Sequence, residues 1–120
     1  MQKDKRIFEI QEFFRIPKHF NPGILGLIYN YPYLDKRYYV EALKKFSKIN
    51  ITAVIIFTDN RVQAEKHFRN YPVSVSNQSI DDFMKLCMCE HIIIDRSDYG
   101  KLAGILAYNP QKIIIQPIGK

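Results

Sequence analysis

Residues 80–117 decide the fold of this chain and read IDDFMKLCMCEHIIIDRSDYGKLAGILAYNPQKIIIQP. Apolar residues first recur at helical spacing from Ile80 to Cys87. Ser79 stands three residues before Asp82, which is the spacing of a capping box. The run at residues 91–94 is apolar on both faces, as expected of a strand that is covered on both sides. We therefore predict a helix followed by a buried parallel strand.

A polar corner at residues 95–98 separates this strand from a second predicted helix, and a closing strand is predicted at residues 112–116. The residues predicted to face the core from the second helix are Tyr99, Leu102, Ala103 and Leu106. A strand that runs into a helix N-terminus presents backbone N–H groups and a positive dipole end, which suits a phosphate. The alternative is that Ser97 and Asp98 only cap the helix.

The composition is that of one folded domain. The 120 residues are 47% hydrophobic and 13% aromatic, enough for a core that buries roughly two-thirds of the unfolded surface. A net charge of +6 favours an anionic partner. The basic residues are scattered and form no basic stripe with interleaved aromatics, so nucleic-acid binding is not predicted. No apolar run approaches the ~20 residues of a membrane helix, and a membrane span is not predicted.

The two cysteines, Cys87 and Cys89, lie two residues apart on a predicted helix. Side chains at this spacing point away from each other, so neither a disulfide nor a metal chelate is favoured. The N-terminus has no continuous apolar segment of the kind found in a signal peptide. Both features predict a cytoplasmic protein.

Strands and helices also alternate before residue 80. Strands are predicted at residues 24–29, 51–57 and 71–75, and helices at residues 35–46 and 60–68. Residues 1–22 are predicted to be an N-terminal arm or stub that ends in a loop at residues 21–23, and residues 23–120 form the domain. The alternation predicts a single α/β, Rossmann-like domain with a parallel sheet of about five strands and helices on both faces.

Three loops are candidates for a ligand site, because open parallel sheets bind ligands beyond the carboxyl ends of their strands. They are residues 29–33, 58–60 and 95–98. Tyr29, Tyr31 and Tyr33 in the first loop suggest either stacking on a sugar or base, or aromatic packing at a strand edge. Neither of the two common glycine-rich phosphate motifs is present in the sequence.

The second half of the chain is similar to the C-terminal part of family 11 glycosyltransferases, the α-1,2-fucosyltransferases. These proteins share an aspartate, an apolar helix, Cys-x-His, an aliphatic strand, a serine-containing corner, an amphipathic helix and a Lys-Ile-Val-x-x-Pro strand. The residues in step with this pattern are Asp82, Cys89, His91, Ile93, Ile94, Ser97, Leu106, Asn109, Pro110, Lys112, Ile113 and Pro117, with Tyr99 in place of a phenylalanine.

The resemblance implies the nucleotide-sugar-binding half of a GT-B-like fold, in a degenerate or truncated form. It implies a transferase of carbohydrate metabolism that uses GDP-fucose as donor, passes fucose to a glycan acceptor and needs no other cofactor or metal. The acceptor side would come from a separate region or a separate chain.

The resemblance also implies which residues touch the donor. Residues 57–60 are similar to the family's Phe-Ser-Asp-Asp corner, which would place Asp59 at the guanine edge or the ribose hydroxyls. Asn60 replaces the second acid, and a capping role explains it equally well. Ser97 and its helix start would hold phosphate, and Arg96 would add charge. The implied nucleotide-sugar-binding set is Asp59, Asn60, Arg96, Ser97, Asp98 and Tyr99, with no catalytic residue assigned.

Departures from the family leave a second interpretation open. Residues 27–33 lack the arginine pair that clamps the diphosphate in the family, and Lys101 and Leu102 replace its tryptophan pair. Arg96 and Asp98 replace an asparagine and a serine or threonine. The alternative is a non-catalytic α/β pseudoenzyme or a protein-interaction module. Whether the chain is an enzyme therefore stays open at this point.

Overall fold

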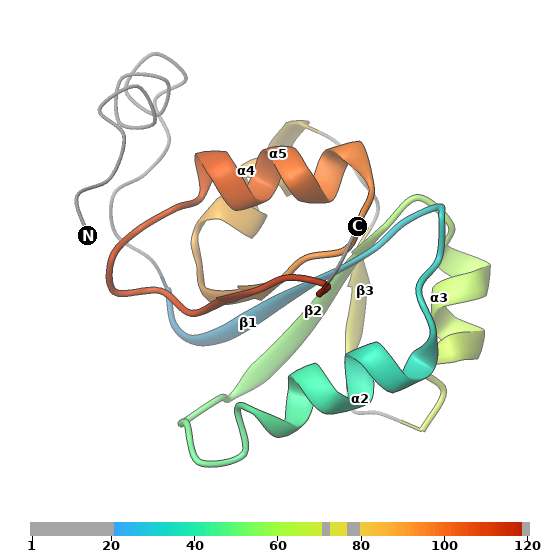
Figure 1. Cartoon of the computed structure of the whole chain (residues 1–120), viewed down its shortest axis with the longest axis horizontal. Helices are drawn as coiled ribbons and strands as arrows, with labels where there is room; N and C mark the ends of the chain where they lie inside the picture. The colour runs from blue at the N-terminus through green and yellow to red at the C-terminus, as the bar shows by residue number, and fades with distance from the viewer. Residues whose placement is uncertain (1–20, 71–72, 77–79, 119–120) are drawn as a thin grey trace.

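The computed structural model describes residues 21–70, 73–76 and 80–118, in which strands and helices alternate (Figure 1). The elements are β1 (Asn21–Tyr29), α2 (Lys36–Lys44), β2 (Ala53–Thr58), α3 (Arg61–His67), β3 (Ser74–Ser76), α4 (Ile80–Cys87), β4 (Cys89–Ile93), α5 (Asp98–Leu106) and β5 (Ile114–Ile115). The predicted arm at residues 1–20 and the predicted capping residue Ser79 lie outside the described residues.

The strands form one five-stranded sheet in the order β3-β2-β1-β4-β5, and every neighbouring pair is parallel. This is the strand order of a doubly wound Rossmann sheet. The prediction of a single α/β domain with about five parallel strands is confirmed.

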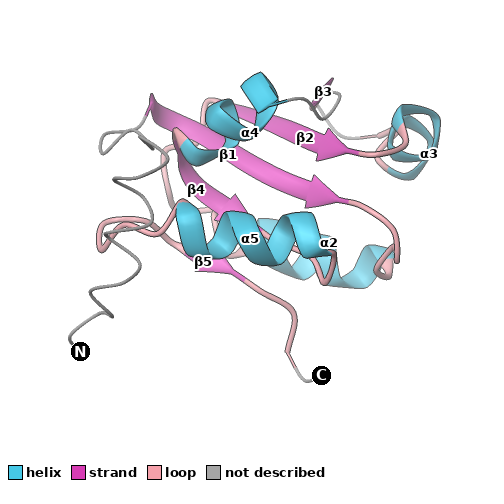
Figure 2. Ribbon diagram, turned by 90° about the horizontal axis from the view of Figure 1, so that it is seen from above, coloured by secondary structure: helices cyan, strands magenta, loops and turns pink. Residues whose placement is uncertain are grey.

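Helices cover both faces of the sheet (Figure 2). Leu27 and Tyr29 of β1 pack with residues of α2 and α3, whereas Ile28 packs with residues of α4 and α5. Successive side chains of a strand point to opposite faces, so a strand buried on both sides must be apolar throughout. That requirement explains the continuous aliphatic runs from which the strands were predicted.

Side-chain caps fix where three helices begin. Asp35 accepts a hydrogen bond from Arg37 N at 2.9 Å before α2. Asn60 accepts from Gln63 N at 3.1 Å before α3, and Ser97 accepts from Gly100 N at 3.0 Å before α5. Each cap satisfies a backbone donor that has no partner inside its own helix. Two of these caps therefore lie in loops that were predicted to bind a ligand.

The predicted loop at residues 21–23 is wrong, because β1 begins at Asn21. Asn21 N donates to Met88 O at 2.8 Å, and Gly23 N donates to a Glu90 carboxylate oxygen at 2.6 Å. Gly23 has a φ of +80°, a conformation that favours glycine. Asn-Pro-Gly reads locally as a turn, but these long-range partners extend the strand across it. The predicted domain boundary after residue 22 therefore falls inside β1.

The placement of Cys89 on a helix is also wrong, because Cys89 is the first residue of β4. It pairs with Asn21 in the register of β1 and β4, which starts the strand two residues before the predicted run at residues 91–94. Both thiols are free and buried. Burial raises the pKa of Cys87 to about 11 and that of Cys89 to about 12. Both cysteines are therefore unreactive core residues at neutral pH.

Candidate functional site at the carboxyl ends of the strands

The central strand β1 lies between β2 and β4 in the sheet (Figure 2). The chain leaves β1 toward β2 on one side and builds β4 on the other side only later. The chain therefore leaves β1 and β4 toward helices on opposite faces of the sheet, and ligands of doubly wound sheets bind at the carboxyl edge beside such a point. The three predicted loops meet there.

Two aspartates hold the loop after β1 from either side. One Asp95 oxygen (Oδ2) accepts a hydrogen bond from Asn30 N at 2.7 Å. One Asp59 oxygen (Oδ2) accepts from the next amide, Tyr31 N, at 3.1 Å. The Asn30 side-chain oxygen accepts in turn from Asp59 N at 2.7 Å. Consecutive amides of one loop thus tie the ends of three neighbouring strands together.

The Asp95 corner is closed from solvent. The Asp95 residue is 1% exposed, and its second oxygen (Oδ1) accepts from Ser97 N at 3.0 Å and from the Ser97 hydroxyl at 2.6 Å. Burial raises the pKa of this carboxyl, and the donors from Ser97 and Asn30 only partly offset the effect. The carboxyl lies against the N-terminal turn of α5, where an external anion would otherwise bind.

Gly100 completes this corner, because a side chain there would displace Asp95. A Cβ atom on Gly100 would lie 2.3 Å from Asp95 Oδ1. Gly100 is consequently a buried residue of α5, whereas Leu102, predicted to face the core, is 49% exposed. Tyr99 is half-buried, and Ala103 and Leu106 are buried as predicted.

The Asp59 corner, in contrast, is open. Asp59 is exposed, and its Oδ1 atom accepts from the Tyr33 hydroxyl at 3.1 Å. Asn60 caps α3, and its own N–H donates to the Thr58 hydroxyl at 3.0 Å. A carboxylate offers about four lone-pair positions. The two bonds from Tyr31 and Tyr33 therefore leave acceptor capacity that faces solvent.

The tyrosines of the β1 loop divide into packed and exposed members. Tyr29 and Tyr33 stack with ring centroids 4.8 Å apart, and the Tyr29 hydroxyl lies 3.0 Å from His67 Nδ1. Tyr31 meets Tyr33 edge-on at 5.9 Å and remains 73% exposed. Packing thus accounts for Tyr29 and Tyr33. The ring of Tyr31 faces solvent, and the backbone N–H of the same residue binds the open carboxylate of Asp59.

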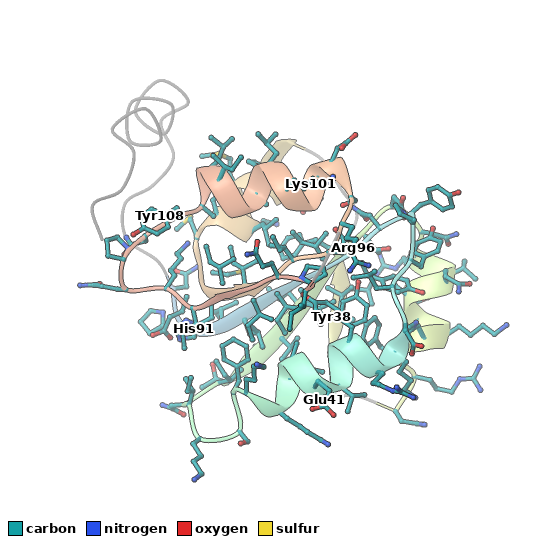
Figure 3. All side chains as sticks on the ribbon, in the orientation of Figure 1. Tyr38, Glu41, His91, Arg96, Lys101 and Tyr108 are labelled. Atoms are coloured by element: carbon teal, nitrogen blue, oxygen red, sulfur yellow. The ribbon has the colours of Figure 1, made fainter. Side chains whose placement is uncertain are left out.

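Two of the remaining predicted residues, Arg96 and Asp98, flank Ser97 in the closed corner. Arg96 is half-buried, and its guanidinium donates to Ile118 O at 2.8 Å (Figure 3). Asp98 is exposed in the first turn of α5. Tyr99 lies apart from the other predicted contacts, because its ring packs edge-on against Phe83 of α4 at 5.3 Å. Its buried hydroxyl has no hydrogen-bond partner among the described residues.

Two residues of the site were given no role from the sequence, Asn30 and Asp95. Both are buried polar residues that connect neighbouring loops. A sequence signal for Asp95 exists in hindsight, because it directly follows an aliphatic strand just as Asp59 follows Thr58. Asn30 carries no comparable signal, because its role depends on the two strands that flank β1.

In residues 21–70, 73–76 and 80–118, no three His, Cys, Asp or Glu side chains come together as a metal site would require. None of the helices within those ranges combines the length and the apolar character needed to cross a bilayer.

Comparisons of the chain with protein-family models, with curated proteins and with solved structures find no match in any of the three. The likeness to fucosyltransferases therefore rests on the sequence of residues 57–60 and 82–117 alone.

Proposed function

We propose that this domain binds a nucleoside diphosphate sugar at the carboxyl ends of β1 and β2, with GDP-fucose as the first candidate. The observation that carries the proposal is the meeting of Asp59 and Tyr31 at the carboxyl ends of β2 and β1, next to the switch point between β1 and β4. The open carboxylate would accept hydrogen bonds from the guanine edge or the ribose hydroxyls. The exposed Tyr31 ring would stack on the base.

The diphosphate would be bound by side-chain cations more than by the start of α5. The Asp95 carboxylate already lies at that helix N-terminus and opposes a second anion there. Arg96 belongs to the same corner, and a guanidinium has five N–H donors, more than its bond to Ile118 O uses. The net charge of +6 would draw an anionic ligand toward the domain.

The proposed activity is transfer of fucose to a glycan acceptor in the cytoplasm, with the acceptor held by a separate region or chain. The resemblance to α-1,2-fucosyltransferases supports this part of the proposal.

The second candidate is a non-catalytic module of the same fold. One observation favours it: Asn60 and Ser97 cap helices, and Asp59 binds the loop after β1 through Tyr31 N. These residues therefore have structural roles that need no ligand.

Thermal unfolding with added nucleotides separates the two candidates. A ligand at about 100 times its dissociation constant adds roughly 2.7 kcal/mol to the free energy of unfolding, which moves the melting temperature by several degrees in a domain of this size. We expect GDP-fucose and GDP to stabilise the chain and ADP and UDP-glucose to leave it unchanged. The absence of a shift with any nucleotide would overturn the first candidate and leave the second.

Three variants test the contacts. Tyr31→Ala should weaken GDP binding roughly tenfold, whereas Tyr31→Phe, which keeps the ring, should bind as the wild type does. Asp59→Asn should also weaken binding, because it replaces the charged acceptor by a neutral one of the same shape. Equal binding by Tyr31→Ala and Tyr31→Phe would contradict stacking at this residue.

A further inference from the structure

An apolar groove runs between α2 and β5. Its volume is about 270 Å³, and its walls include Tyr38 and Ala42 of α2 and Ile115 of β5. The Tyr38 hydroxyl donates to Ile94 O at 2.5 Å, which fixes this wall of the groove (Figure 3). Ile118 lies at the end of the groove and is 94% exposed.

The groove exists because β5 is a short edge strand. β5 pairs with β4 over two residues, Ile114 and Ile115, and the chain then leaves the sheet (Figure 2). Ile113 and Ile115 both direct backbone carbonyls to β4. The alternation of a parallel ladder therefore turns the N–H and C=O of Ile114 toward the open edge. Open strand edges with apolar side chains favour association.

The charges on the groove match a second copy of the same surface. Tyr38, Glu41 and Ala42 of α2 and its C-cap residue Lys45 form one stripe at the spacing i, i+3, i+4 and i+7, and all four line the groove. Glu41 and Lys45 carry opposite charges one turn apart, and both are exposed. A two-fold axis midway between them would place Glu41 of each copy opposite Lys45 of the other. The two-fold symmetry thus gives two identical ion pairs, each between Glu41 of one copy and Lys45 of the other.

We propose that the α2–β5 groove is a homodimer interface, in which Ile118 of each copy enters the groove of the other and Glu41 faces Lys45 across the two-fold axis. The dimer covers the most exposed isoleucine of the described residues and the open edge of β5. One end of the interface borders the proposed nucleotide site, because Ile118 O accepts a hydrogen bond from Arg96. Asp59 and Tyr31 are not among the residues that line the groove.

Sedimentation equilibrium of the full chain tests the proposal first. We expect a mass approaching twice 14.2 kDa as the concentration rises from micromolar to millimolar. A mass of 14.2 kDa at every concentration would overturn the proposal and leave the groove to a different occupant.

A matched pair of variants locates the interface. Ile118→Asp should weaken dimerisation at least roughly 100-fold, because each copy loses a buried side chain and gains a buried charge. Val62→Asp is the control, since Val62 is also exposed, at 76%, but lies on α3. It should leave the dimer intact. A dimer that resists Ile118→Asp, or that is lost equally in both variants, would contradict this interface.

Charge reversal tests the symmetry. Glu41→Lys and Lys45→Glu should each weaken the dimer roughly tenfold, because each creates two like-charge contacts across the axis. The double variant restores opposite charges within the same chain and should return the dimer close to wild-type affinity. Failure of the double variant to recover would overturn the Glu41–Lys45 pairing. Glu41 Oε1 also lies 3.7 Å from Lys44 Nζ in the same helix, so a charge change there can alter the stability of the monomer. A thermal melt of each variant at low concentration therefore verifies that it is folded.

Discussion

Two corners of the sheet each carry an aspartate at the end of a strand, but the two aspartates have different environments. Asp59 follows β2 and Asp95 follows β4, and each accepts a hydrogen bond from an amide of the loop after β1. Asp95 is 1% exposed and has two further donors from Ser97, whereas Asp59 is exposed and accepts from the Tyr33 hydroxyl. The closed corner therefore maintains the fold, and the open corner retains capacity for a ligand.

This difference arises from the helix that follows each strand. Gly100 allows the first turn of α5 to contact the Asp95 carboxylate directly, so the corner closes. The first turn of α3 carries Arg61 and Val62, which are exposed. The Asp59 carboxylate accepts hydrogen bonds from the loop after β1 instead, from Tyr31 N and the Tyr33 hydroxyl. A residue type at a strand end is thus insufficient to assign a function, because burial decides which role it has.

Removal of each carboxylate is expected to give the largest difference between the two corners. Asp95→Ala should lower the free energy of unfolding by about 3 kcal/mol, because it leaves buried donors of Asn30 and Ser97 without an acceptor. Asp59→Ala should lower it by about 1 kcal/mol or less, because water can replace the lost acceptor. Urea unfolding measures both values. Equal losses would show that the two carboxylates contribute equally to stability, which would contradict the contrast between the corners.

A smaller loss is expected at Gly100. Gly100→Ala should cost about 2 kcal/mol, since the new methyl group must displace the Asp95 side chain. Gly104→Ala is the control in the same helix, where the nearest atom is the end of the flexible Ile94 side chain at 3.1 Å. It should be close to neutral, because the helix gains up to about 1 kcal/mol from alanine. The same urea experiment would contradict a closed corner if both variants behaved alike.

Removal of the helix cap should also cost more stability at the closed corner than at the open corner, but the difference should be smaller. Ser97→Ala should cost about 1.5 kcal/mol, because it removes both the cap of α5 and a donor to Asp95. Asn60→Ala should cost about 1 kcal/mol or less, because the Asn60 cap is exposed. Thermal melts of the two variants give the comparison. A larger loss of stability for Asn60→Ala than for Ser97→Ala would contradict the conclusion that the closed corner maintains the fold.

The smallest effect is a pH dependence specific to the closed corner. Burial raises the pKa of Asp95 above its ordinary value of about 3.9, so the folded chain binds this proton more tightly than the unfolded chain does. The resulting stabilisation is complete below the unfolded-state pKa and is lost as the pH rises through the folded-state pKa. The stability of the wild type relative to Asp95→Asn should therefore fall across this acidic interval. A carboxyl pKa at or below 3.9, measured by NMR titration, would contradict the expected sign.

Most of the fold could be predicted from local patterns. The aliphatic runs at residues 51–57 and 91–94 are strands because a sheet covered on both faces needs apolar residues at every position. Asp35 and Ser97 marked helix starts because short polar side chains satisfy orphan N–H groups. The start of β1 could not be predicted, because its partners at Met88 and Glu90 are distant in the chain.

The candidate site was only partly predictable. The sequence indicated that the three loops would meet, and Asp59 does lie at their junction. It could not separate Tyr31 from Tyr33, because both lie in one loop and only the stacking of Tyr33 on Tyr29 distinguishes them. Tyr99 matched the family pattern, yet its ring packs against Phe83 of α4.

The sequence by itself determined the alternation of strands and helices, and hence the parallel sheet, because hydrophobic period and capping residues are local properties. Only the tertiary structure decided which aspartate is closed and which is open, and that β5 leaves a groove beside α2. These features depend on how a helix packs against a neighbouring strand, which the order of residues within either element does not specify.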